Sequence, residues 1–350
     1  IKFNLEWSID HSKLNLIYTN SENAYGWMYN NLGGNPIIKI VEAFKDKYKF
    51  RQFTREMYPD FYYKSVHLNE LDQFDFSKLT YPIIIKPSSG FFSIGVHKIN
   101  QLSEWPIIIK KLQEELVELA KAFPREVIDG TQLLIEQYIT GREFAFDAYF
   151  NDQGEVVILN VLEHIFSGED DVSDRVYITS TSLIKQYHDL FKDFLLEVSN
   201  KIPLHEVPLH VEVRVDDHGL LMPIEINPLR FGGMCSTADF TYHAYGFNPY
   251  EYYFNQQKPD WEAIEKDVQN RLFAIIVLDN STGINGKSIQ QFDYDSIIKG
   301  LKSPIEFRKM DYTKYPFFGM CFIELESGEL EEVDWLLKSD LKEYIISHKL

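Results

Sequence analysis

Apolar residues recur along this chain with two periods that alternate from one segment to the next. Spacings of three and four residues, typical of one face of a helix, occur at 36–48, 102–123 and 182–202. Short apolar or alternating runs, typical of strands, occur at 82–86, 133–138, 143–150, 156–162 and 272–278. Because strands alternate with helices, the pattern predicts an α+β or α/β enzyme with several subdomains. It does not predict a repeat array or a helical bundle.

The segments 209–214 and 221–228 predict two strands joined by a tight turn. Alternation places Glu212 on one face of the first strand, and Glu225 and Asn227 on one face of the second. Two carboxylates and an amide oxygen can then converge, and such ligands suit Mg²⁺, which completes its shell with water and nucleotide phosphates. The alternative is a surface hairpin with solvated acids. The apolar neighbours of Glu225 favour the metal, because charges in apolar strands are rare unless they are paired or metal-bound.

A strand that ends in a lysine precedes a loop rich in serine and glycine at 81–96. Lys86 would supply a point charge, while amides and hydroxyls around Ser89, Gly90 and Ser93 can donate to phosphate oxygens. No Gly-Lys-Ser/Thr follows, so this is not a Walker loop. Such a loop alone is also typical of a plain turn, and the lysine beside it favours phosphate binding.

Two glutamates, Glu136 and Glu143, flank a turn at Gly141. The strands 133–138 and 143–150 are expected to pair across this turn. One interpretation is a plain hairpin with exposed acids. The other is a hinge strand whose backbone pairs with an adenine edge, while Glu143 accepts hydrogen bonds from ribose hydroxyls.

Taken in order, these three motifs resemble the ATP-grasp superfamily over roughly residues 40–245. The likeness is greatest to carboxylate–amine ligases, especially amino-acid (dipeptide) ligases, whose metal strands often read His-x-Glu followed by Glu-x-Asn-Pro-Arg and a glycine pair. The resemblance implies an α+β fold in which two subdomains clasp ATP. The expected divisions are an N-terminal region at 1–65, a small subdomain at 66–132, a large subdomain at 133–260 and a C-terminal α+β extension at 261–350.

The resemblance also implies roles for individual residues at the nucleotide. A lysine at the end of a helix and the lysine of the small-subdomain strand would contact phosphates, a loop would cover them, and the hinge would line the adenine and ribose pocket. Those residues are Lys47, Lys86, Ser89, Gly90, Ser93, Glu136, Tyr138 and Glu143. The Mg²⁺ ligands, for which Mn²⁺ is an alternative ion, would be Glu212, Glu225 and Asn227.

Four further residues receive roles at the reacting groups. Arg175 stands in the region where a basic residue of the family contacts the terminal phosphate. The family's Asn-Pro-Arg is Asn-Pro-Leu-Arg here, so Arg230 stands one position late for contact with an acyl phosphate or a substrate carboxylate. Gly233 would offer a backbone amide to an oxyanion. His210 faces the site by strand parity, either as a contact to the intermediate or as a structural histidine.

The implied activity is an ATP-dependent ligase that joins a small carboxylate to an amine. The carboxylate would take the γ-phosphate as an acyl phosphate, and the amine would then displace phosphate to give an amide or peptide bond. Two alternatives stay open: a carboxylase-like enzyme that activates bicarbonate, and a nucleotide-binding protein without turnover. A homodimer is expected from the habit of the family.

Charge and cysteine content limit the partners further. The net charge is −18, from 35 basic and 53 acidic residues, which argues against a nucleic-acid ligand. Two cysteines far apart in sequence give no disulfide framework, which favours a reducing compartment such as the cytoplasm. No apolar run approaches the ~20 residues of a membrane span, so no membrane partner is expected.

Overall fold

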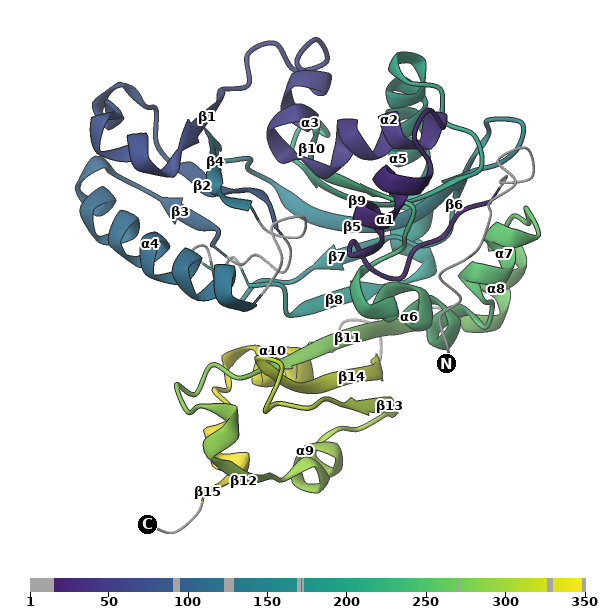
Figure 1. The fold of residues 1–350 in the computed structure, drawn as a ribbon. Coiled ribbons are helices and arrows are strands. Elements are labelled where there is room, and N and C mark those ends of the chain that lie inside the picture. Colours follow the sequence, from purple (N-terminus) through teal and green to yellow (C-terminus); the bar gives the residue numbers. More distant parts are fainter. Residues whose placement is uncertain are drawn as a thin grey trace.

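The computed structural model describes residues 16–90, 95–122, 129–168, 171, 173–269, 271–325 and 330–347. Two main β-sheets dominate the described part of the chain, and every strand pair in them is antiparallel (Figure 1). The four-stranded sheet has the order β1–β4–β2–β3, with β1 at Tyr63–His67, β2 at Ile83–Ser89, β3 at His97–Ile99 and β4 at Asp129–Gln137.

The nine-stranded sheet has the order β10–β9–β5–β7–β8–β11–β14–β13, and β6 pairs with β5 at its side. Its strands are β5 (Arg142–Phe150), β6 (Val156–Ile158), β7 (Leu162–His164), β8 (Val176–Thr179), β9 (Val207–Val215), β10 (Leu221–Pro228), β11 (Leu272–Asp279), β13 (Pro304–Lys309) and β14 (Phe317–Leu325). A separate short pair joins β12 (Ile289–Phe292) to β15 (Ile345–Ser347).

Helices cover both sheets. The described α-helices are α1 (Ala24–Asn31), α2 (Pro36–Lys45), α3 (Lys47–Thr54), α4 (Trp105–Ala122), α5 (Thr181–Lys201), α6 (Ser236–Tyr245), α7 (Pro249–Phe254), α8 (Trp261–Val268), α9 (Tyr294–Gly300) and α10 (Glu331–Lys338). Figure 1 shows α4 beside the small sheet at the left, and α2, α3 and α5 above the large sheet. In this part of the chain no helix has the length and apolar character needed to span a bilayer.

Local sequence explains why two helices meet at Lys47. Asn35 caps α2 by accepting from the amide of Ile37, and Pro36 occupies the first helical position. Asp46 then interrupts the helix with an extended backbone and caps α3 through its carboxylate. The first residue of α3 is therefore Lys47, which the caps hold at a fixed place.

The predicted hairpin of β9 and β10 is confirmed. The carboxylate of Asp216 accepts from the amides of His218 and Leu220, which shapes the turn. A β-bulge between Pro223 and Glu225 shifts the register of β10.

The predicted pairing of 133–138 with 143–150 is wrong. β4 pairs with β1 and β2 in the small sheet, whereas β5 pairs with β9, β6 and β7 in the large sheet. The chain crosses between the sheets at Gly141, where φ is +110° and an added Cβ would lie 2.4 Å from the carbonyl oxygen of Val215. This close approach excludes any side chain at Gly141, so the turn is a link between sheets.

The prediction of a single strand at 156–162 is also wrong, because the structure has two strands there, β6 and β7. The break contains Asn160, which is fully buried and pairs with Asp147 twice: its amide nitrogen donates to the carboxylate and its oxygen accepts from the backbone amide. These side-chain bonds replace ladder bonds and separate the two strands.

Strand membership does not follow the expected divisions of the chain. β4 lies in the small sheet along its whole length, so the division between 132 and 133 falls inside a strand. β11, β13 and β14 extend the large sheet, so the C-terminal region shares this sheet and adds a core of its own below it (Figure 1).

Candidate functional site

A pocket opens where the small sheet, the link at Gly141 and the large sheet come together. Its walls come from α3, β2, β4, β5, β7, β8, β9 and β10. Eight of the residues expected at the nucleotide or the metal line it: Lys47, Lys86, Gly90, Glu136, Tyr138, Glu143, Glu212 and Glu225. The structure thus brings together residues that are up to 178 positions apart in sequence.

A buried charge cluster forms the wall on the side of the small sheet. The carboxylate of Glu136 on β4 forms an ion pair with Nζ of Lys86 on β2 at 2.6 Å. It also accepts two hydrogen bonds from the guanidinium of Arg51, at 2.6 and 3.2 Å. Burial alone would raise the pKa of Glu136, but the charges and hydrogen bonds of Arg51 and Lys86 outweigh it and lower that pKa to about 2. Burial lowers the pKa of Lys86 against the attraction of Glu136.

Lys47 joins three parts of the pocket. Its Nζ lies 2.7 Å from Oε2 of Glu225 and donates to the carbonyl of Gly90 at 3.1 Å. Ser88 donates to Asp46, the cap that precedes Lys47, at 2.9 Å. Ser89, the last residue of β2, is half-buried beside these contacts, and Ser93 lies outside the described residues.

The link between the sheets is held by Arg214 on β9. Its guanidinium donates to Glu143 at 2.8 Å and to the carbonyl of Ile139 at 2.6 Å, and it lies 4.8 Å from the ring centre of Tyr138. His164 contacts the other oxygen of Glu143 at 2.9 Å. Burial would raise the pKa of Glu143, but these two partners outweigh it and lower that pKa.

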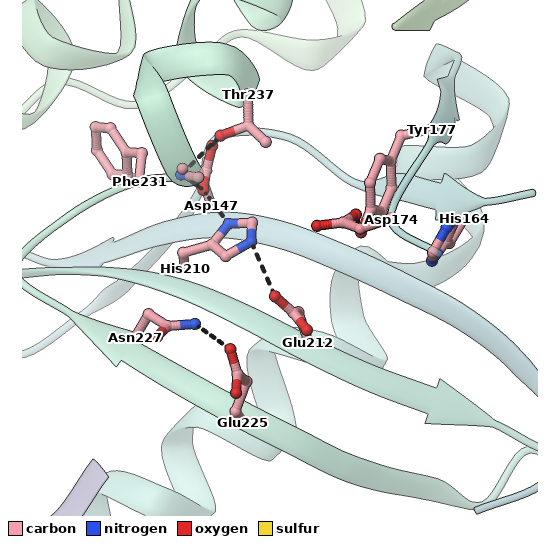
Figure 2. Close-up of polar contacts among 12 residues, drawn as sticks. Asp147, His164, Asp174, Tyr177, His210, Glu212, Glu225, Asn227, Phe231 and Thr237 are labelled. Atoms are coloured by element: carbon pink, nitrogen blue, oxygen red, sulfur yellow. Dashed lines mark hydrogen bonds and ion pairs between the residues drawn. The ribbon is translucent and has the colours of Figure 1, made fainter. Parts of the chain in front are cut away.

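The expected metal ligands lie on the facing strands of the hairpin (Figure 2). Glu212 and Glu225 are opposed residues, and the amide nitrogen of Asn227 donates to Oε1 of Glu225 at 2.8 Å. Burial and the charge of Glu225 raise the pKa of Glu212. Burial would also raise the pKa of Glu225, but Lys47 and Asn227 outweigh it and the net shift is downward.

This donor set fits Mg²⁺. Within the described residues no group of three His, Cys, Asp or Glu side chains is placed to hold a metal ion, and the donors available here are the carboxylates of Glu212 and Glu225 and the amide oxygen of Asn227. Mg²⁺ is commonly bound by one or two carboxylates, with water and phosphate oxygens completing six ligands. Glu212 and Glu225 face each other across the hairpin, and a bound cation would offset the repulsion between their charges.

His210 lies between Asp147 and Glu212, one of the expected metal ligands. Its Nδ1 is 2.8 Å from the carboxylate of Asp147, and its Nε2 is 3.5 Å from Glu212. Burial would lower the pKa of His210, but its bonds to Asp147 and Glu212 raise it to about 9. Both ring nitrogens are therefore engaged by protein carboxylates.

All four residues expected at the reacting groups, including His210, lie outside the pocket lining. Arg175 donates to the carbonyls of Leu336 and Leu337 at the end of α10, both at 2.9 Å. Arg230 pairs with Glu22 at 3.2 Å, beyond the end of β10. Gly233 begins a short 3₁₀ turn at Gly233–Cys235.

Sequence reasoning did not assign Arg51, Asp147, Asp174 or Tyr177. Asp174 and Tyr177 line the pocket, and the hydroxyl of Tyr177 donates to Asp174 at 2.5 Å. A signal was available for these two, because they flank Arg175 in a segment already placed near the phosphates. The sequence gave no such signal for Arg51 and Asp147, since their partners are distant in sequence.

Residues 79–238 match the family model described as the ATP-grasp domain. The fold agrees with it, since the structure of an L-amino acid ligase from Bacillus licheniformis superposes with a TM-score of 0.66, covering 95% of this chain and 80% of that chain at 19% identity. The chain therefore contains an ATP-grasp domain at residues 79–238 and has the ATP-grasp fold. An N5-carboxyaminoimidazole synthase from Aspergillus clavatus also shares the ATP-grasp fold, with a TM-score of 0.61 over 92% of this chain and 79% of that chain at 11% identity.

Two curated relatives match shorter stretches of the chain. The D-alanine–D-alanine ligase of Acetivibrio thermocellus is 30% identical over 124 residues, which are 35% of this chain and 28% of the relative. The carbamoyl phosphate synthase large chain of Caldanaerobacter subterraneus subsp. tengcongensis is 29% identical over 130 residues, 37% of this chain and 11% of the relative. The matches thus span 28% of one relative and 11% of the other.

Proposed function

We propose that this ATP-grasp chain is an ATP-dependent ligase that joins a small carboxylate to an amine and releases ADP and phosphate. The observation that best supports this is the charge pattern of one pocket. Lys47 and Lys86 enter it from the helix and the small sheet, and Glu212 and Glu225 enter it from the large sheet. Such a pocket suits a polyanion bound together with a divalent cation.

Each side of the pocket has a distinct task in this proposal. Lys47 and Lys86 would offset phosphate charge, and the hinge at Tyr138 would line the adenine, with Glu143 toward the ribose. Glu212, Glu225 and the amide oxygen of Asn227 would hold Mg²⁺ (or Mn²⁺), which when bound neutralises charge on the phosphates.

The reaction would proceed in two steps on the substrates. A carboxylate oxygen attacks the γ-phosphorus, the bond to the β-phosphate oxygen breaks, and ADP leaves an acyl phosphate. The amine nitrogen then attacks the acyl carbon, loses a proton and expels inorganic phosphate. We expect the backbone amide of Gly233 to face the oxyanion, and Arg230 to meet a substrate carboxylate after exchanging its partner Glu22.

The choice of a carboxylate–amine ligase draws support from two relatives. The superposed structure is that of an L-amino acid ligase, and a curated match is a D-alanine–D-alanine ligase. A carboxylase-like reaction on bicarbonate is the second candidate, because the N5-carboxyaminoimidazole synthase has nearly the same TM-score. We also propose that the protein acts in the cytoplasm on small molecules, and as a homodimer.

The test is phosphate release from Mg-ATP with amino acids supplied alone and in pairs, followed by mass spectrometry. A product with the mass of two substrates minus water, formed with ADP, would establish the ligase. Turnover that requires bicarbonate would instead favour the second candidate. Nucleotide binding without ADP formation across the matrix and with bicarbonate would indicate a non-catalytic protein.

A further inference from the structure

A single buried carboxylate, that of Asp147 on β5, collects donors from four segments of the chain. Oδ1 accepts from Nδ1 of His210 at 2.8 Å and from the amide of Gly232 at 3.1 Å. Oδ2 accepts from Thr237 at 2.5 Å and from Asn160 at 2.8 Å. The side chain of Asp147 is fully buried, so these four bonds replace its hydration.

The donors of these bonds do not come from the strand that bears the carboxylate. His210 lies on β9, Gly232 follows β10, Thr237 lies on α6, and Asn160 stands between β6 and β7. Figure 2 shows Thr237 and His210 reaching Asp147 from opposite sides. Because both oxygens are engaged by several donors, the orientation of this carboxylate is fixed.

Through His210, Asp147 is connected to Glu212, one of the proposed metal ligands. With Nδ1 held by Asp147, the ring of His210 directs Nε2 toward Oε1 of Glu212 at 3.5 Å. A carboxylate on one ring nitrogen fixes the tautomer and orientation of a histidine, and partners of this kind affect how strongly a neighbouring metal is bound.

Asp147 also contacts the glycine pair after β10, Gly232 and Gly233, through the amide of Gly232. The hydroxyl of Thr237 accepts from the amide of Gly232 at 2.8 Å, and an added Cβ at Gly232 would lie 2.3 Å from Thr237. The next residues, Met234 and Cys235, have φ values of 55° and 63° although neither is glycine. Backbone in this rare conformation persists only where surrounding contacts determine it, and Asp147 holds Gly232 before these two residues and Thr237 after them.

We infer that Asp147 is a positioning residue whose carboxylate fixes both the ring of His210 against Glu212 and the backbone of Gly232 before Gly233. It thereby sets the metal ligands and the glycine pair relative to each other. This inference rests on the proposed function, in which Glu212 binds Mg²⁺ and Gly233 faces the oxyanion of the reacting carboxylate. Asp147 itself lies outside the pocket lining and would touch neither the metal nor the substrate.

The first test measures the Mg²⁺ dependence of ADP binding by calorimetry in Asp147→Asn. The amide keeps the size of the side chain but can accept at only one atom. We expect the Mg²⁺ concentration for half-saturation to rise by about tenfold, while ADP binding in excess EDTA stays at the wild-type value. Asp152→Asn, the same change at an exposed position just after β5, is the matched control.

The second readout does not depend on turnover or on metal. In protein labelled with ¹⁵N-histidine, the ring nitrogens of His210, assigned with His210→Gln, should change their shifts in Asp147→Asn and not in Asp152→Asn. If Asp147→Asn does not fold, Thr237→Val is compared with Thr237→Ser. The valine removes one donor to Asp147 and should raise the Mg²⁺ requirement about threefold, whereas the serine keeps the hydroxyl and should match wild type.

The outcomes separate this inference from the proposed function. A folded Asp147→Asn with the Mg²⁺ requirement and His210 shifts of the control overturns the positioning role. Equal Mg²⁺ requirements in Thr237→Val and Thr237→Ser would also overturn the positioning role. Wild-type protein that binds no Mg-ADP overturns the proposed function instead, and with it the metal part of the inference.

Discussion

Glu212 and Glu225 are directly opposed on β9 and β10, and their pKa values are displaced in opposite directions. Both side chains are only half-buried, with exposed fractions of 25% for Glu212 and 13% for Glu225, but their loss of hydration still raises the pKa of each carboxylate. Only Glu225 has a lysine within 2.7 Å and an amide donor on its other oxygen. Glu212 therefore holds the less compensated charge of the pair, and a bound cation would stabilise it most.

Removing Glu225 should abolish turnover without unfolding the protein. In Glu225→Ala, we expect ATP-dependent phosphate release to fall on the order of a hundredfold or more, because a ligand of Mg²⁺ and the partner of Lys47 are both lost. Thermal unfolding should shift by only a few degrees, since repulsion with Glu212 disappears as well. Asp217→Ala, in the exposed turn of the same hairpin, is the control. Activity equal to this control would contradict the metal assignment.

Arg175 should prove to be a stability residue. Its guanidinium binds two carbonyls of α10 and lies 2.7 Å from Asp279 on β11. Arg175→Ala would leave both carbonyls and the half-buried carboxylate of Asp279 without this partner, at a cost of about 1–3 kcal/mol of unfolding free energy. The KM for ATP should stay near the wild-type value in protein that remains folded. A raised KM with unchanged urea stability would instead restore the phosphate role implied by the family.

Local features of the sequence account for what could be predicted. The hairpin of β9 and β10 depends on alternation and on the Asp216 turn, and both are visible within twenty residues. The same alternation gave Glu212 and Glu225 a common site.

Contacts between distant segments account for what could not be predicted. Whether β4 and β5 pair with each other depends on the close approach of Gly141 to Val215, 74 residues later. The partners of Glu136 depend on Arg51 reaching β4 from α3. No period or spacing within a segment reports such contacts, so the hinge glutamate gave no sign of its buried ion pairs.

Those ion pairs predict a specific acid sensitivity. The pKa of Glu136 falls from its ordinary 4.5 to about 2 on folding, so the folded state favours the charged form. The resulting stability is complete above about pH 5 and is lost as pH falls from there through 2. Its size is on the order of 3 kcal/mol, at 1.36 kcal/mol per unit of pKa. Urea unfolding between pH 3 and 7 measures it.

The control for this prediction is a glutamine that does not titrate. Glu136→Gln should be less stable than wild type at pH 7 by about 3–5 kcal/mol, because Arg51 and Lys86 lose their counter-charge. This difference should shrink toward pH 3, whereas Glu114→Gln, on the exposed side of α4, should follow wild type throughout. A difference that is constant with pH would mean that Glu136 does not titrate in this window.

Gly141 offers a test of the link between the two sheets, with Gly219 as a matched site. Both have positive φ, +110° and +81°, but only at Gly141 would a Cβ meet backbone, at 2.4 Å from Val215. Gly219→Ala should cost about 1–2 kcal/mol of unfolding free energy from its conformation alone. Gly141→Ala should cost at least about 1–3 kcal/mol more, because the chain must move away from β9. It should also raise the KM for ATP, since Tyr138 and Glu143 stand on either side of the displaced link. Equal losses of stability in the two variants, with equal KM, would show that the sheets do not depend on this contact.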